Sequence, residues 1–458
     1  MSINQFTNIK RQNYYRTSTL ILVAFATAFL PRIITTVGAP KPLNFLHFIA
    51  VPFACILAIS QSKSKDAKQI NIAWLVIAGL LVYLTIMTAS ALINQAGIIN
   101  LVVDYLLKVE PFLLLLAITS IPLSIQSYEF IRKWLIRFCF SHIFLIYGQY
   151  FLFIVLGRHP KAGNPDYVQG IFYESGSGHV VGASVGLTFG LYYFFFAKAA
   201  PIWIRISVLF ATFWGMLLAD AKQVLFTFII AGGILFLSKT KDIVETLKYL
   251  IPGLIFTVVF LWCVQNVPAF GAFNTWMRPD IYGSDGEATL LKTASLRIIP
   301  TFYETPLNMF LGLGPGHSVG RLGGWMLREY EDLLAPLGSS IHPASGAVWG
   351  AVSDSWLGDQ SSMFSPLFGW AGIWGDTGLF GLGAYLFLYI LVFIYLCQDD
   401  FSKFCWLTVL AHGLIFSQME EPGFMLFIVM IIGLQWQYKR IKELHLKELR
   451  YSAYSQNY

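Results

Sequence analysis

The stretch KTASLRIIPTFYETPL, residues 292–307, followed closely by GLGPGHS, residues 312–318, stands at the centre of a long polar segment. This polar segment runs from Gln265 to Pro366, and apolar sequence long enough to cross lipid lies on both sides of it. Its roughly 100 residues far exceed the usual connection between two elements, and loops of that length are usually functional. We therefore expect a membrane protein whose chemistry is located in this segment.

Composition places most of the chain in a bilayer. Of its 458 residues, 56% are hydrophobic and 12% are charged, whereas a typical soluble domain has about 25% charged residues. A transmembrane helix needs about 20 mostly apolar residues. This criterion predicts an all-α polytopic membrane protein with about 12 transmembrane helices, near residues 18–37, 43–60, 70–92, 101–122, 134–156, 180–198, 202–219, 222–238, 248–266, 379–397, 402–418 and 422–437.

The positions of Lys and Arg indicate the orientation, because cytoplasmic loops carry an excess of positive charge. Every short loop on one side of the predicted bundle is basic, from Lys10 and Arg11 at the start to Lys439 and Arg440 at the end. We therefore expect both termini in the cytoplasm. The net charge of +6 follows this pattern and is not gathered into one patch, so it does not indicate a nucleic-acid partner.

These expectations divide the chain into four parts. Residues 1–266 hold transmembrane helices 1–9, with a smaller external loop at 157–179. Residues 267–365 form a large external loop that carries the site. Residues 366–438 hold transmembrane helices 10–12, and residues 439–458 form a basic cytoplasmic tail.

Charged residues near the outer ends of predicted helices are a second set of candidates. Charged groups within a span are costly and often mark functional sites, although snorkelling or pairing of Asp104 with Lys108 at i,i+4 would also explain them. They all lie toward one face, which favours a site where a lipid-linked headgroup would lie. The set comprises Asp104, Lys108, Glu110, Asp220, Lys222, Glu420 and Glu421.

Residues 291–300 predict a short amphipathic helix on the membrane surface. A guanidinium in such a place binds phosphate through two parallel hydrogen bonds, although an ordinary surface arginine would give the same pattern. The predicted apolar side holds Leu291, Ile298 and Ile299, and the polar side holds Lys292, Ser295 and Arg297.

The order of these motifs resembles the bacterial O-antigen polymerase/ligase family. Arg297, then Glu304-Thr-Pro306-Leu, then the glycines of residues 312–316 are similar to the Arg segment, Pro-Leu pair and Gly-x-Gly-x-Gly of that family's large periplasmic loop. Three further stretches are similar to its first periplasmic loop, its Ser-Arg position and its exit from the large loop: GIFYESGSGH at 170–179, Ala221-Lys222, and WGDTGLFG at 374–381. The resemblance covers roughly residues 165–400.

The resemblance implies a GT-C-like, inverting membrane glycosyltransferase of the bacterial inner membrane. Its substrate would be undecaprenyl-pyrophosphate-linked glycan at the outer face, and it would need neither metal nor other cofactor. It would polymerise O-antigen or exopolysaccharide repeat units, with a flippase and a chain-length regulator as partners. An O-antigen ligase that transfers glycan to a lipid or protein acceptor is the alternative. A polysaccharide flippase or transporter is an alternative of another class.

The absence of the family's usual His-Asn pair, which would fall near Leu367, favours polymerase over ligase. Lys222 and Arg297 match the family's two basic positions, which hold the donor pyrophosphate, although Lys222 lacks the fork of an arginine. The base that activates the acceptor hydroxyl stays open. The catalytic candidates are Arg297, His317, His342 and Glu304, with Asp354 and Asp359 as further carboxylates. The remaining substrate-binding candidates are Lys292, Gly314, Gly316 and Glu174.

Overall fold

The computed structural model describes residues 17–36, 38–61, 67–158, 163–173, 176–239, 243–360 and 362–455, and no strand occurs in these ranges. This confirms the all-α class. The main helices are Thr17–Ala26, α2 (Leu30–Thr36), α3 (His47–Ser60), α4 (Ala67–Ile93), α5 (Ile98–Ser120), α6 (Ile125–Gln149), α7 (Gly178–Phe196), α8 (Ile202–Leu218), α9 (Lys222–Leu237), α10 (Ile243–Asn266), α18 (Phe368–Tyr395), α19 (Asp400–Gly413) and α20 (Pro422–Ser455).

Several of these helices are suited to a bilayer. Among the described residues, five are long and apolar enough to cross a membrane, and four shorter apolar helices accompany them. Each of the predicted spans coincides with one or two helices, but α5 contains three charged residues and α19 has only 14 residues. The number of twelve spans therefore stays a prediction. The five helices are Lys41–Ser60, Gln69–Ile93, Ile125–Val155, Gly178–Phe196 and Ser362–Tyr395.

The first predicted span, 18–37, is divided in the structure. One helix ends at Ala26, residues 27–29 form a turn, and α2 begins at Leu30. Pro31 explains the division, because proline has no N–H to bond the carbonyl four residues earlier and its ring clashes with that carbonyl. The division places Arg32 on a short helix of its own.

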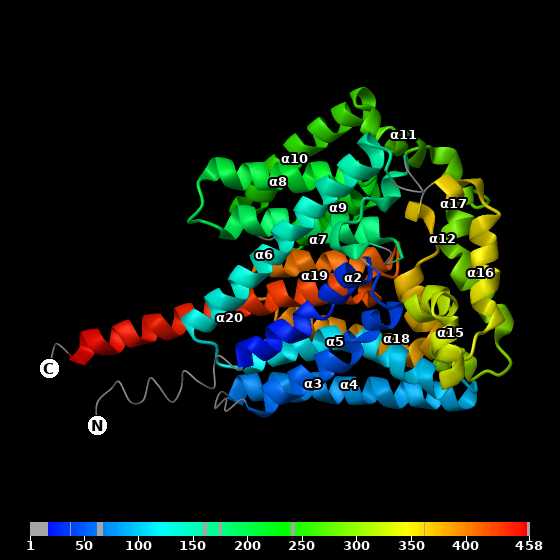
Figure 1. The fold of residues 1–458 in the computed structure, drawn as a ribbon, viewed down its shortest axis with the longest axis horizontal. Coiled ribbons are helices and arrows are strands. Elements are labelled where there is room, and N and C mark those ends of the chain that lie inside the picture. Colours follow the sequence, from blue (N-terminus) through cyan, green and yellow to red (C-terminus); the bar gives the residue numbers. More distant parts are fainter. Residues whose placement is uncertain are drawn as a thin grey trace.

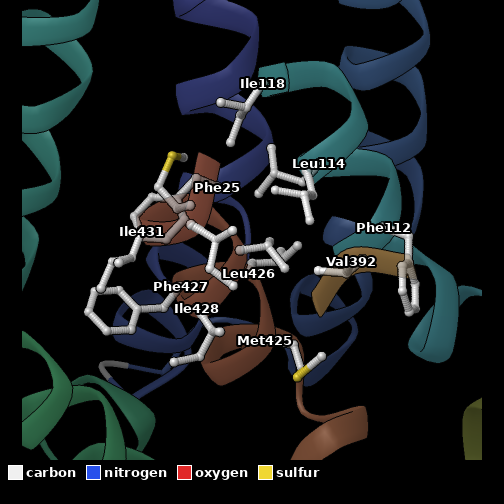
Figure 2. Packing of buried hydrophobic residues seen from close by; sticks show 14 of the residues in the cluster. Phe25, Phe112, Leu114, Ile118, Val392, Met425, Leu426, Phe427, Ile428 and Ile431 are labelled. Atoms are coloured by element: carbon white, nitrogen blue, oxygen red, sulfur yellow. The ribbon is translucent and has the colours of Figure 1, made fainter. Parts of the chain in front are cut away.

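Helix α20 forms the centre of the bundle (Figure 2). Its residues from Phe424 to Ile432 are completely buried, and it packs against α5, α6, α7 and α19. A helix that is apolar on all sides is surrounded either by other elements or by lipid. In this structure the sequence FMLFIVMII of residues 424–432 is surrounded by other helices and forms the core.

The polar segment folds into a layer over one end of the bundle, at the right in Figure 1. The C-terminal part of α20 leaves the bundle at the opposite end. The layer therefore lies at one end only. Its helices are α11 (Ala272–Trp276), α12 (Glu287–Ile298), α13 (Asn308–Leu311), α14 (Leu327–Glu329), α15 (Glu331–Leu334), α16 (Pro343–Ser353) and α17 (Trp356–Gln360).

Helix α12 confirms that residues 291–298 are helical with one buried side, with one difference from the expected faces, whereas its place on the membrane surface stays a prediction. Leu291 is buried and Arg297 is exposed, as expected. Ser295, predicted on the polar side, is completely buried. That prediction was wrong because Ser295 stands four residues after Leu291, and positions i and i+4 share a face of a helix.

Candidate functional site

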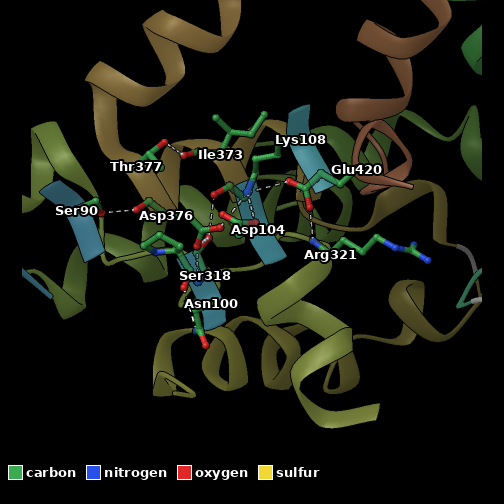
Figure 3. Close-up of polar contacts among 12 residues, drawn as sticks. Ser90, Asn100, Asp104, Lys108, Ser318, Arg321, Ile373, Asp376, Thr377 and Glu420 are labelled. Carbon is green, nitrogen blue, oxygen red and sulfur yellow. Dashed lines mark hydrogen bonds and ion pairs between the residues drawn. The ribbon is translucent and has the colours of Figure 1, made fainter. Parts of the chain in front are cut away.

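Two charged residues of α5 belong to a buried charge cluster, defined as Asp104, Lys108, Asp376 and Glu420 (Figure 3). The Lys108 Nζ contacts Asp104 Oδ1, and it lies 3.5 Å from Asp376 Oδ2 and 3.6 Å from Glu420 Oε1. All four side chains are completely buried. One ammonium group therefore faces three carboxyl groups that come from α5, from α18 and from the 3-10 turn Gln418–Glu420.

A break in α18 positions Asp376. Gly378 has φ +64°, which interrupts the regular helix two residues after Asp376. The N–H of Leu313 donates to the Gly375 carbonyl at 2.8 Å, and that of Gly314 donates to the Asp376 carbonyl at 3.1 Å. The glycine-rich motif of the polar segment therefore docks on the broken helix.

Ser318 and Arg321, which follow the glycines of residues 312–316, contact the buried charge cluster directly. Asp376 Oδ1 accepts from the N–H of Ser318 at 2.8 Å and from its hydroxyl at 2.7 Å. Glu420 Oε2 accepts the N–H of Arg321. The cluster thus orients residues 318–321, and so it fixes the position from which the Arg321 side chain extends (Figure 3).

Arg321 and Arg32 converge on one carboxylate. Glu421 Oε1 accepts from Arg32 Nη2 at 2.7 Å and lies 3.8 Å from Arg321 Nη2, while Glu421 Oε2 accepts the N–H of Phe424 at the start of α20. Both arginine side chains are at least nine-tenths buried. Burial and the neighbouring Arg32 lower the pKa of Arg321 below its usual value. The two guanidinium groups share one negative charge, so an added anion would be stabilised here.

A small pocket lies beside these two arginines, and we call it the arginine pocket. It receives residues from α2, from the start of α3, from the loop at 157–179 and from the polar segment. Trp325 stacks on the Arg321 guanidinium, with 5.0 Å between the guanidinium carbon and the ring centroid. The pocket therefore combines positive charge with aromatic rings. The residues that line it include Arg32, His47, Tyr173, Arg321, Trp325 and Tyr330.

His47, at the first position of α3, is paired with a carboxylate. Its Nδ1 lies 2.8 Å from Glu110 Oε2, and the Glu110 side chain is completely buried. If Glu110 accepts a hydrogen bond from Nδ1, the ring proton lies on Nδ1 and Nε2 is the nitrogen that can accept a proton. This is the arrangement in which a carboxylate orients a histidine base.

The structure brings three predicted catalytic residues together inside the polar segment. The rings of His317 and His342 stack with centroids 5.3 Å apart. Burial and His317 lower the pKa of His342, and the exposed Glu304 carboxylate offsets part of this lowering. Burial also lowers the pKa of His317. His317 bonds the Leu313 carbonyl at 2.8 Å and the Ser340 hydroxyl at 2.7 Å. Both nitrogens of His317 are therefore engaged, and its role as a base stays a prediction.

The other predicted basic residues lie outside the arginine pocket. Lys222, at the start of α9, pairs with Asp220. Arg297 donates to the Leu290 carbonyl at 2.8 Å and to the Thr293 hydroxyl at 3.2 Å. Lys292 donates to the carbonyls of Ser365 and Leu414, and burial lowers its pKa to about 7. Their roles as substrate-binding residues stay predictions.

The remaining candidates differ in what the structure says of them. Gly314 has φ +106° and Gly316 has φ +71°, and each meets neighbouring side chains closely, so both are required by the backbone. Asp354 is exposed. Glu174 and the side chain of Asp359 lie outside the described residues. No group of three or more His, Cys, Asp or Glu in the described part of the chain is arranged to hold a metal ion.

Sequence reasoning did not select Arg32, His47 or Arg321. A signal existed for Arg32, because it lies within a predicted span, where an arginine is expensive and usually functional. Asp376 stood in the quoted motif WGDTGLFG, but no role was assigned to it. No comparable signal marks Arg321.

No family model matches this chain, and no curated protein matches it. The likeness to the O-antigen polymerase/ligase family therefore rests on the short motifs quoted above, and membership of that family stays a prediction.

Proposed function

We propose that this protein is an inverting membrane glycosyltransferase that polymerises lipid-linked oligosaccharide units, with the arginine pocket as its donor site. The observation that carries the proposal is the convergence of Arg32 and Arg321 on Glu421, beside the His47–Glu110 pair. The substrate class, undecaprenyl-pyrophosphate glycan at the outer face of the bacterial inner membrane, comes from the resemblance of the motifs.

The two arginines supply what a pyrophosphate leaving group requires. Negative charge develops on the pyrophosphate as the glycosidic bond breaks, and groups fixed in advance stabilise it without reorganisation. A guanidinium is suited to this because its fork matches two phosphate oxygens. Glu421 holds both arginines in place by accepting from Arg32 and capping α20.

His47 supplies the base in this mechanism. The acceptor hydroxyl oxygen attacks the anomeric carbon, and the hydroxyl proton passes to His47. The bond from that carbon to the pyrophosphate oxygen breaks, and its electron pair leaves with the pyrophosphate. Glu110 stabilises the imidazolium that forms, because its Oε2 lies 2.8 Å from Nδ1. The configuration of the sugar is inverted in a single displacement.

Aromatic residues surround the pocket, whose volume of about 20 Å³ places a sugar at its mouth and not inside it. Tyr173, Trp325 and Tyr330 line the pocket, and aromatic side chains are a common lining of sites for sugar rings. Tyr173 comes from the loop at 157–179, and Tyr330 contacts Phe45 edge-to-face. Both external loops would therefore contact the same glycan.

The test is polymer formation in the native cells after replacement of single residues. Arg32→Ala, Arg321→Ala and His47→Ala should each lower polymer formation by about 10² to 10³, which is the usual effect of losing one charge-stabilising group. Arg321→Lys should restore part of it, because a point charge replaces the fork. The matched control is Arg278→Ala, since Arg278 is an exposed arginine of the same polar segment.

Several outcomes decide between the two possible donor sites, and between a polymerase and a ligase. Normal polymer in Arg321→Ala cells with a normal protein level would overturn the arginine pocket as the donor site. If Arg297→Ala cells lose the polymer and the arginine-pocket variants do not, the donor site is at α12, as the motifs predict. Cells without the protein should accumulate single repeat units on the lipid carrier; accumulation of lipid-linked polymer that is not transferred would indicate a ligase.

One observation favours a transporter as the second candidate. The buried charge cluster places one lysine against three carboxyl groups, and buried ionisable groups of this kind mark proton or ion pathways in membranes. Purified protein in vesicles distinguishes the two. Movement of lipid-linked glycan across the bilayer without new glycosidic bonds would support the transporter.

A further inference from the structure

A large cavity lies far from the arginine pocket, between α6, α7, α9, α19 and α20. Its volume is about 1030 Å³. Residues 435–442 of α20 line it where this helix leaves the bundle, at the end opposite the polar segment (Figure 1). Its inner wall is apolar and aromatic, and includes Leu191, Phe196, Leu235, Phe401 and Phe404.

The cavity continues into an apolar groove along the bundle. The groove, of about 950 Å³, runs between α7, α8, α9 and α10, and shares Leu191, Gly232 and Phe404 with the cavity. Cavity and groove together are larger than the roughly 300–1,000 Å³ of an ordinary small-molecule site. Their combined shape, apolar along its length and polar at one end, fits a lipid with long chains.

The polar rim of the cavity has an excess of positive charge. Its acidic side chains are already occupied: Glu129 lies 3.2 Å from Arg132, Asp400 lies 2.9 Å from Lys239, and Asp399 caps α19. Three exposed lysines of the rim, Lys198, Lys439 and Lys442, have no ion-pair partner among the described residues. A ligand with an anionic group would therefore complement the charge of this rim.

Gln435 adds an independent indication. Its side chain lines the cavity and is 5% exposed, and it makes no hydrogen bond with another described residue. Its amide is not among the described side-chain groups that are buried without a partner, so the small exposed part of Gln435 lies at the cavity. In the same helix, Gln437 donates to two backbone carbonyls. Gln435 is therefore available to a ligand in the cavity.

We propose that the cavity and groove bind an anionic phospholipid as a specific ligand. Its phosphate lies among Lys198, Lys439 and Lys442, an ester carbonyl accepts from the Gln435 amide, and an acyl chain follows the groove past Gly232. With the orientation expected from the Lys and Arg distribution, the site faces the cytoplasmic leaflet, where anionic lipids attract basic residues. The proposal is independent of the glycosyltransferase function.

The test uses the full chain in detergent with added phosphatidylglycerol or phosphatidylcholine. Native mass spectrometry should show one phosphatidylglycerol retained per protein, and phosphatidylcholine should not replace it. The triple variant Lys198→Gln/Lys439→Gln/Lys442→Gln should bind phosphatidylglycerol roughly 100-fold more weakly, at about fivefold for each lysine. Lys133→Gln is the control, because Lys133 is an exposed lysine of α6 that does not line the cavity.

A second variant tests the groove. Gly232→Leu should reduce retention of the lipid, because the new side chain occupies the junction between cavity and groove, where the nearest foreign atom to an added Cβ is 4.0 Å away. A helical Leu in place of Gly favours the helix, so the variant should fold. Equal binding of the two phospholipids, an unchanged triple variant, or displacement of phosphatidylglycerol by a polyprenyl phosphate would each overturn the proposal.

Discussion

Replacement of Lys108 should destabilise the protein strongly. Lys108→Met keeps a long unbranched side chain but removes the ammonium group that faces Asp104, Asp376 and Glu420. Removal of one partner from a buried ion pair costs about 3–5 kcal/mol, because the remaining charge is buried without compensation. We expect a loss of this size, since all four side chains are completely buried.

The assay is thermal unfolding of the purified protein, followed by tryptophan fluorescence. An unfolding entropy of about 2.1 cal/mol/K per residue gives a chain of 458 residues about 1 kcal/mol/K. The melting temperature of Lys108→Met should therefore fall by about 3–5 °C. In the double variant Asp104→Asn/Lys108→Met part of this loss should be recovered, because the nearest carboxylate no longer needs a cation.

Lys41→Met provides the control for this experiment. Lys41 pairs with Glu329 at 2.7 Å, but its side chain is 63% exposed. An exposed ion pair contributes only about 0–1 kcal/mol. If Lys108→Met unfolds at the same temperature as Lys41→Met, the buried charge cluster does not stabilise the fold, and our account of how residues 318–321 are held is wrong.

Two further predictions concern the polar segment and its contact with α18. Gly378→Ala should prevent normal folding, because Gly378 has φ +64° and an added Cβ would lie 2.2 Å from a backbone atom of Phe310. The control is Gly383→Ala in the same helix, whose added Cβ meets nothing within 4 Å, so this variant should express normally. Equal levels of the two variants in the membrane would refute this prediction. Lys292 has its pKa lowered by burial from 10.5 to about 7, so the unfolded chain binds more protons between these values and stability should rise with pH across this range. Lys292→Met should remove this rise in unfolding experiments, and an unchanged slope would contradict the buried position of the amine.

Local sequence patterns predicted the helices well and the site only in part. The spans coincide with helices because hydropathy is a property of consecutive residues, and α12 follows from its spacing. The charges of α5 were selected because they lie inside an apolar run. Their partner Asp376 was not recognised, since Lys108 and Asp376 are far apart in the sequence and meet only where α18 packs near α5 in the folded chain.

The sequence by itself therefore determined an all-helical membrane protein, with a long polar segment between apolar helices and charges near the ends of several of them. Only the tertiary structure decided which charges meet. Arg32 is isolated by the turn before Pro31, and Arg321 stands beyond the glycine-rich motif, yet both reach Glu421. The physical reason is that periodicity and hydropathy act over one or two turns of helix. A pocket, in contrast, is formed by side chains from distant segments, and packing around the buried core of α20 brings these segments together.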